Sequence, residues 1–194
     1  MPKLLEGEAP SGLGEAVMTL VTKRGFTVET AASLTELKGA NGITDFGARS
    51  VRIREDMDDA AMVKTMIHEA AHVLLHETVP GSLLDRPRQE VEAESVAFIV
   101  AAAHGMSSGD YSFPYVAAWA GPDPAKTIAQ TQARVSQAAK VILGASPAPH
   151  TTGGKVPGIE LALARAGSER NGVLNRLQQT DIGLIGQTDA AALQ

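Results

Sequence analysis

Two histidines and a glutamate have the spacing of a metal site on one predicted helix. His68 and His72 stand four residues apart, and Glu69 directly follows His68. Residues i and i+4 of a helix lie on one face, about 6 Å apart along the axis, so both imidazoles can bind one Zn²⁺ ion. Glu69 then flanks the metal without binding it, where it can accept a proton from a coordinated water. The alternative is a pair of surface histidines, but the segment is strongly apolar, and buried polar groups are costly unless they are paired.

A third ligand must come from another element, because a catalytic zinc usually has three protein ligands and an open position. His76 follows His72 by one helical turn. It would lie about 12 Å along the axis from His68, too far for the two to share one ion. We therefore interpret His76 as a helix-end histidine near exposed carbonyl groups.

The next predicted helix carries three glutamates, of which two point in the same direction. Glu90 and Glu94 are four residues apart and share one face, which Ala97 and Ala101 continue with small side chains. Small side chains there would allow this helix to pack closely against the histidine helix. Glu92 points roughly 160° away from Glu90, and we expect it to face solvent. From the spacing alone, either Glu90 or Glu94 can be the third ligand.

This arrangement resembles that of the gluzincin peptidases, in which HExxH is followed by a ligand glutamate one helix later and an acidic residue four positions further on. The resemblance implies that Glu90 is the third ligand and that Glu94 accepts the ring N–H of a ligand histidine. It also implies zinc-assisted hydrolysis of an amide bond, with Glu69 as the general base. Tyr111 or Tyr115 is a candidate donor to the developing oxyanion, although each also fits the role of a core or lid aromatic.

The elements that must position these residues form one predicted α+β domain over residues 11–144. Apolar periodicity, ended by glycine or proline, predicts helices at about residues 11–24, 89–104 and 124–143, and a further helix that is capped by Asp56, Asp58 or Asp59 and ends at about residue 78. Alternation of apolar and polar residues predicts strands at residues 26–30, 43–46 and 50–54, the last two as a hairpin. Residues 1–10 are expected to form a flexible arm, and residues 145–194 a mobile linker and tail that begins with proline and glycine.

The composition excludes several classes of protein. Of the 194 residues, 44% are hydrophobic and 20% are charged, which is typical of a globular domain. A formal net charge of −5 argues against a dedicated nucleic-acid binder, whose surface is usually basic. The absence of cysteine excludes disulfides and thiolate zinc ligands, and it fits a reducing cytoplasm. There is neither an apolar run of about eighteen residues nor an apolar signal segment, so we expect a cytoplasmic protein with no membrane partner.

Four stretches resemble the metallopeptidase-like domain of actinobacterial and phage ArdC-type antirestriction proteins and, more distantly, the ImmA/IrrE metallopeptidases. They are residues 39–46, 63–69, 90–98 and 111–119. The resemblance covers roughly residues 12–143 and implies a zincin-like fold, with a small twisted sheet, the HExxH helix beneath it and a following ligand helix. It also implies that the strand at residues 50–54 borders the cleft and can pair with an extended substrate backbone. Longer family members carry an N-terminal single-stranded-DNA-binding domain, which the ten residues before the first helix cannot form, so nucleic-acid binding is not expected.

Two functions other than general peptide hydrolysis remain open. The chain can be a non-catalytic accessory or antirestriction module that keeps zinc for its structure. Alternatively, it is a regulatory peptidase that cuts one repressor, as the ImmA/IrrE resemblance suggests. Glu69 favours an enzyme, because a purely structural zinc site has no need of a carboxylate that does not bind the metal. The expected partner is a peptide or protein substrate, whose identity the sequence does not give.

Overall fold

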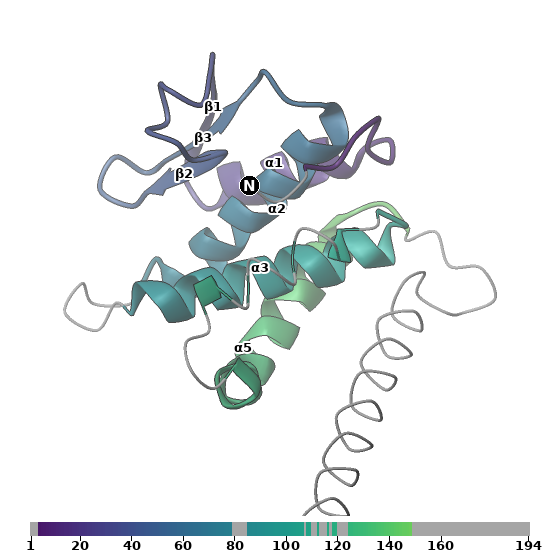
Figure 1. The fold of residues 1–194 in the computed structure, drawn as a ribbon. Helices are drawn as coiled ribbons and strands as arrows, with labels where there is room; N and C mark the ends of the chain where they lie inside the picture. The colour runs from purple at the N-terminus through teal and green to yellow at the C-terminus, as the bar shows by residue number, and fades with distance from the viewer. Residues whose placement is uncertain are drawn as a thin grey trace, which may run out of the picture. The chain divides into compact units, whose positions relative to one another are not determined.

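The computed structural model describes residues 4–78, 85–106 and 124–148, together with single positions between residues 108 and 119. These residues all belong to one compact unit, residues 1–157. The architecture is α+β, as predicted, and residues 149–194 of the predicted tail lie outside the described residues. In chain order the elements are α1 (Leu13–Lys23), β1 (Thr27–Ala31), β2 (Gly42–Asp45), β3 (Ser50–Arg54), α2 (Asp59–His76), α3 (Arg86–Ala103) and α5 (Pro124–Ala145) (Figure 1).

The three-stranded sheet has β3 in the middle, between β1 and β2. β3 pairs parallel with β1 and antiparallel with β2, so Val51 lies opposite both Val28 and Thr44. The hairpin of β2 and β3 that the sequence predicts is confirmed. The expectation that the strand at residues 50–54 borders the cleft and pairs with a substrate is wrong, because both of its edges are paired within the sheet and its residues do not line the cleft described below. β2 is an edge strand of this sheet instead, and it contacts α2.

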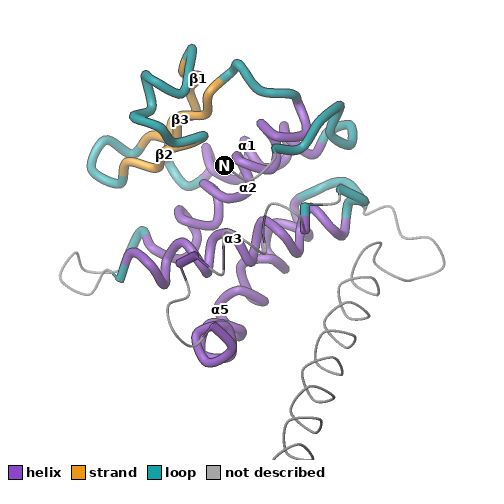
Figure 2. Tube along the Cα trace, in the orientation of Figure 1, coloured by secondary structure: helices purple, strands orange, loops and turns teal. Residues whose placement is uncertain are grey.

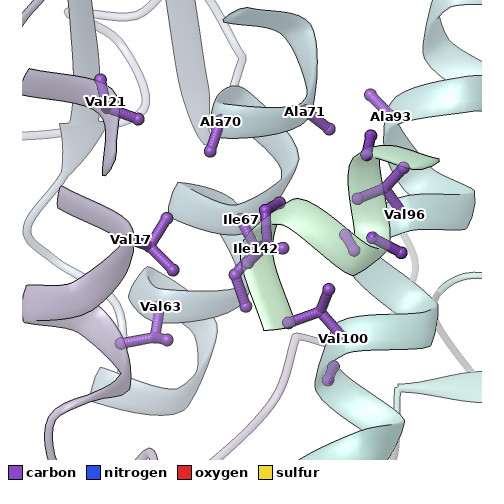
Figure 3. Close-up of a cluster of buried hydrophobic side chains, with 14 of the residues drawn as sticks. Val17, Val21, Val63, Ile67, Ala70, Ala71, Ala93, Val96, Val100 and Ile142 are labelled. Atoms are coloured by element: carbon purple, nitrogen blue, oxygen red, sulfur yellow. The ribbon is translucent and has the colours of Figure 1, made fainter. Parts of the chain in front are cut away.

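The helix α2 lies between the sheet on one side and α3 and α5 on the other, while α1 lies beside α2 and contacts β1 (Figure 2). α2 contacts β2 and β3, and it packs against α1, α3 and α5. Each of these helices contributes aliphatic side chains to one core, whose burial favours folding. Figure 3 shows part of this core, with Val17 and Val21 from α1, Val63, Ile67, Ala70 and Ala71 from α2, Ala93, Val96 and Val100 from α3, and Ile142 from α5.

Alanines on α3 form the surface that faces its neighbours. Ala97 and Ala101 are completely buried, as the small-residue face of the sequence predicts, and Ala93 is completely buried as well. Such small side chains leave room for the backbones of two packed helices to approach each other. α3 begins at Arg86, three residues before the predicted start at residue 89. Pro87 is tolerated in its first turn, because a backbone N–H at that position has no partner within the helix.

Residues near the N-terminus hold the start of α2. The backbone N–H of Gly7 donates to Asp58 Oδ2 at 2.8 Å, and that of Ala9 donates to Asp59 Oδ2 at 2.7 Å. Ala60 N–H in turn donates to the carbonyl oxygen of Gly7 at 2.9 Å. Asp58 occupies the N-cap position of α2, but its carboxylate binds the preceding segment and makes no capping bond to the helix. The segment predicted as an arm therefore contacts the helix that carries both histidines. No helix in the described part of the chain has the length and apolar character to cross a membrane.

Candidate metal centre

Three side chains from α2 and α3 converge on one point. His68 Nε2 lies 3.2 Å from His72 Nε2 and 3.4 Å from Glu90 Oε2, and His72 Nε2 lies 3.9 Å from the same oxygen. This group can hold a metal ion, because the three ligand atoms lie within 4.8 Å of one another. The side chains of all three residues are only 12–13% exposed. The structure thus brings together the three residues that the sequence analysis selected as ligands.

The chemistry of these atoms fits a cation. The other ring nitrogen, Nδ1, lies 3.1 Å from Glu94 Oε2 in His68 and 3.0 Å from His76 Nδ1 in His72. If each Nδ1 carries the proton of a neutral imidazole, both Nε2 atoms present lone pairs to the carboxylate of Glu90. Three acceptors that face one another require a positive charge between them. Two imidazole nitrogens and one carboxylate oxygen are a donor set that zinc commonly takes.

The pKa values of the two histidines shift in opposite directions, so that one of the two rings is positively charged and the other is neutral. Burial alone would lower the pKa of His68, but hydrogen bonds to Glu90 and Glu94 and the charge of Glu69 outweigh it and raise this pKa to about 10. The pKa of His72 is lowered to about 3, first by burial and then by the positive charge of His68. Without metal, the protonated His68 therefore supplies the positive charge at this position. Binding of a metal ion would release that proton.

Glu69 lies beside this group, and β2 fixes its position. The hydroxyl of Thr44 donates to Glu69 Oε2 at 2.7 Å, and Glu69 is only 5% exposed. β2 passes so close to α2 that a Cβ atom on Gly42 would lie 2.8 Å from Glu69 Oε1. Only glycine fits there without a shift. Burial raises the pKa of Glu69, against the lowering effects of the His68 charge and the Thr44 hydrogen bond. The sequence analysis did not find Thr44 or Gly42, because it placed a different strand beside the cleft.

Glu94 contacts His68 from the side away from Glu90. One carboxylate oxygen lies 3.1 Å from His68 Nδ1, and the other lies 2.6 Å from Lys64 Nζ and accepts from the hydroxyl of Ser112. Burial would raise the pKa of Glu94, but His68 and Lys64 hold it at about 2, so the carboxylate is ionised. Burial lowers the pKa of Lys64, against the opposite effect of Glu94. Sequence reasoning missed Lys64, although a lysine one helical turn before His68 in an apolar helix could have been noticed.

One sequence interpretation is wrong at this site, and another is incomplete. Glu92 was expected to face solvent, but it is only 1% exposed. His76 ends α2, as expected, but it is buried rather than near solvent, with 2% exposed. His76 Nε2 lies 2.9 Å from Glu92 Oε2. The side of α3 away from Glu90 is covered by α5, from which Arg134 reaches to 3.4 Å from Glu92. The expectation that Glu92 does not share the metal with Glu90 agrees with this position.

A cleft of about 840 Å³ opens above the converging residues. It is lined by residues 37–44, by the face of α2 with both histidines and Glu69, and by the first turns of α3. Thr44 and its neighbours in β2 therefore form part of the wall beside Glu69. Tyr111 and Tyr115, the predicted oxyanion donors, lie outside the described residues.

Comparisons with known proteins found one protein family and one curated relative that are similar to parts of this chain. An uncharacterized protein of Bacillus anthracis is 43% identical over 53 residues, which are 27% of this chain and 9% of that protein. No solved structure matches the chain significantly. Residues 22–112 match the peptidase family model described as the IrrE N-terminal-like domain, in agreement with the resemblance to the ImmA/IrrE metallopeptidases. The resemblance to ArdC-type proteins stays a prediction. The stretch that contains the sheet, both histidines of α2 and Glu90 is thus similar to the IrrE N-terminal-like peptidase domain.

Proposed function

We propose that the protein is a zinc-dependent peptidase in which His68, His72 and Glu90 bind the metal and Glu69 is the general base. The observation that carries this proposal is that the cleft contains both a group of metal ligands and a separate carboxylate beside them. Three acceptor atoms converge where a cation is required, while a fourth acidic group, Glu69, is held beside them by Thr44. The match to a peptidase family supports hydrolysis of an amide bond.

The residues of this chain have separate roles in the proposed reaction. A bound zinc ion would supply Lewis-acid chemistry, lowering the pKa of a coordinated water to about 7 and polarising the scissile carbonyl. Glu69 accepts the proton of the attacking water and returns it to the leaving amine. Its raised pKa brings it nearer to the pH at which proton transfer in both directions is efficient. Thr44 keeps the carboxylate in one orientation through its hydrogen bond.

The expected substrate is a peptide or protein in extended conformation. β2 is an edge strand of the sheet and also lines the cleft, so its outer edge can pair with a substrate backbone. This role passes to β2 because both edges of β3 are paired within the sheet. We further propose a cytoplasmic location, which the absence of cysteine fits.

The decisive experiment compares wild type, Glu69→Gln and Glu15→Gln. Zinc content is measured first, and all three proteins are then profiled against an unbiased peptide library. Glu69→Gln should keep its zinc and lose at least about 10² in hydrolysis, the usual contribution of a general base. Glu15, an exposed residue of α1, provides the matched control and should behave as wild type.

Two other outcomes would replace the proposal. Equal hydrolysis by Glu69→Gln and wild type would remove the catalytic role of Glu69. A zinc-loaded wild type that cleaves no peptide would favour the non-catalytic antirestriction or accessory module. Cleavage confined to one co-encoded protein would keep the chemistry and identify a regulatory peptidase.

A further inference from the structure

A chain of hydrogen bonds runs from His72 into the interior, away from the cleft. His72 Nδ1 lies 3.0 Å from His76 Nδ1, and His76 Nε2 lies 2.9 Å from Glu92 Oε2. Arg88 Nε lies 3.2 Å from the other oxygen of Glu92. His76 and Glu92 are among the largest completely buried side chains of the described residues. The proposed reaction does not use either of them.

The direction of each hydrogen bond follows from the chemistry of the groups. Glu92, next to two guanidinium groups, is ionised and can only accept, so His76 Nε2–H donates to it. A neutral His76 then has its lone pair on Nδ1, which accepts from His72 Nδ1–H. The remaining nitrogen of His72, Nε2, keeps its lone pair and faces His68 and Glu90. The carboxylate of Glu92 thereby determines the tautomer of a histidine that it does not touch.

α5 contributes to this arrangement through Arg134. Its Nη2 donates to the carbonyl oxygen of Leu75 at 2.7 Å and lies 3.4 Å from Glu92 Oε2. Leu75 belongs to the last turn of α2, where carbonyl groups have no partner within the helix. One guanidinium therefore ties Glu92 to the end of the helix that carries His72 and His76. The two metal-facing histidines differ in this respect, because His68 contacts its carboxylate, Glu94, directly.

We propose that His76 and Glu92 are positioning residues for His72. They hold it as the Nδ1–H tautomer with Nε2 directed at the metal position. This inference rests on the proposed metal site, but the tautomer is a property of the metal-free protein as well. A buried polar pair that serves only the stability of the fold would change neither the tautomer of His72 nor the affinity for metal.

The test uses His76→Phe, which keeps an aromatic ring but removes the acceptor. Histidine ¹⁵N spectra of the metal-free proteins at about pH 8, where an ordinary imidazole is neutral, report the tautomer of His72. Wild type should show Nδ1–H in a hydrogen bond to His76, and His76→Phe should lose this hydrogen bond and shift the tautomer balance of His72 away from Nδ1–H. Zinc affinity, measured by competition with a chromophoric chelator, should fall by about 10–100-fold, which is the usual loss when the hydrogen-bond partner of a metal ligand is removed. His76→Gln can still accept from His72 and donate to Glu92, so it should recover most of the affinity.

His104→Phe is the matched control. His104 is also a buried histidine at a helix end, hydrogen-bonded to Ser146 Oγ at 3.0 Å, but it lies about 21 Å along α3 from Glu90. Its replacement should reduce stability without changing zinc affinity. If His76→Phe does not fold, Glu92→Leu replaces it, because Arg88 and Arg134 are 42% exposed and can turn to water. Glu92→Leu should also weaken zinc binding and disturb the tautomer.

The results separate failure of this inference from failure of the proposed function. Unchanged zinc affinity and an unchanged His72 tautomer in the His76 or Glu92 variant would overturn the positioning role. A wild type that binds no zinc would overturn the metal site, while the ¹⁵N spectra would still show whether His76 sets the tautomer. Equal losses of zinc affinity in His76→Phe and His104→Phe would assign the effect to general destabilisation and overturn the inference.

Discussion

Lys64 Nζ lies 2.6 Å from Glu94 Oε1 inside the protein, with side chains that are 7% and 1% exposed. The pair connects the interior of α2 with the carboxylate that contacts His68. A buried charge is strongly destabilising when its partner is removed, because neither water nor another charge then compensates it. This relationship makes Lys64 part of the support of the candidate site, because Glu94 in turn contacts His68.

Lys64→Met should therefore reduce the free energy of unfolding of the metal-free protein, by at most about 3–5 kcal/mol because His68 and the hydroxyl of Ser112 still contact Glu94. Urea denaturation followed by circular dichroism measures this change. The double variant Lys64→Met with Glu94→Leu should recover part of the loss, since apolar side chains then replace both members of the buried ion pair, although His68 loses its contact with Glu94. Glu36→Gln breaks the exposed contact with Arg52 and should cost at most about 1 kcal/mol. Equal effects of Lys64→Met and Glu36→Gln would contradict the importance of burial.

Gly42→Ala should damage hydrolysis without removing the metal. The added Cβ would lie 2.8 Å from Glu69 Oε1 and 2.8 Å from Thr65 Cγ2, so the carboxylate must move. A misplaced general base loses much of its contribution of about 10²–10⁴ in rate. Gly47→Ala is the control, because its Cβ would meet its nearest atom at 3.4 Å. A Gly42→Ala protein with wild-type hydrolysis would show that Glu69 tolerates displacement.

The glutamates of α3 should separate in a titration with zinc. Glu90→Ala removes a proposed ligand and should abolish tight binding, whereas Glu94→Ala should weaken binding by about 10–100-fold through the loss of support for His68. Glu29→Ala, on β1, serves as a control at an exposed position and should leave zinc affinity unchanged. A larger loss of zinc affinity in Glu94→Ala than in Glu90→Ala would exchange the roles of the two residues.

The stability of the metal-free protein should depend on pH with a defined sign. The pKa of His68 is raised to about 10 in the folded state, so its stabilising effect is complete below the unfolded value of about 6.5 and is lost as the pH rises to about 10. The pKa of His72 is lowered to about 3, so stability is lost as the pH falls from about 6.5 toward that value. Chelator-treated protein should thus be most stable near pH 6.5. In thermal denaturation, His68→Gln should lack the decrease on the alkaline side.

Local periodicity was sufficient to predict the arrangement of His68 and His72, since both lie on one helix whose geometry relates residue i to residue i+4. The same rule placed Glu90 and Glu94 on one face of α3. The burial of Glu92 was not predictable in this way. The side of a helix that points away from one neighbour faces solvent only if no third element covers it. Here α5 covers the side of α3 that carries Glu92, and α5 begins more than thirty residues later in the chain.

The sheet gives the second example of this limit. The alternation of Ser50–Arg54 predicted a strand but did not determine its place in the sheet. β3 pairs with β1 across a long sequence separation, and this pairing moves it to the centre and leaves β2 at the edge. The roles of Thr44 and Gly42 depend on that order. Residues whose function follows from non-local pairing could be found only in the folded structure.

The proposed ligands also divide unequally between the two helices, with His68 and His72 on α2 and Glu90 on α3. A bound ion would therefore act as a cross-link, which closes the chain segment between His72 and Glu90 and limits the separation of the helices. Short loops are inexpensive to close, because the entropy cost grows only with the logarithm of their length. α2 carries two of the three proposed ligands, and the packing of α3 against α2 supplies the third. Removal of the ion should consequently speed amide hydrogen exchange first in the opening turns of α3, while the alanine-lined middle of that helix stays protected.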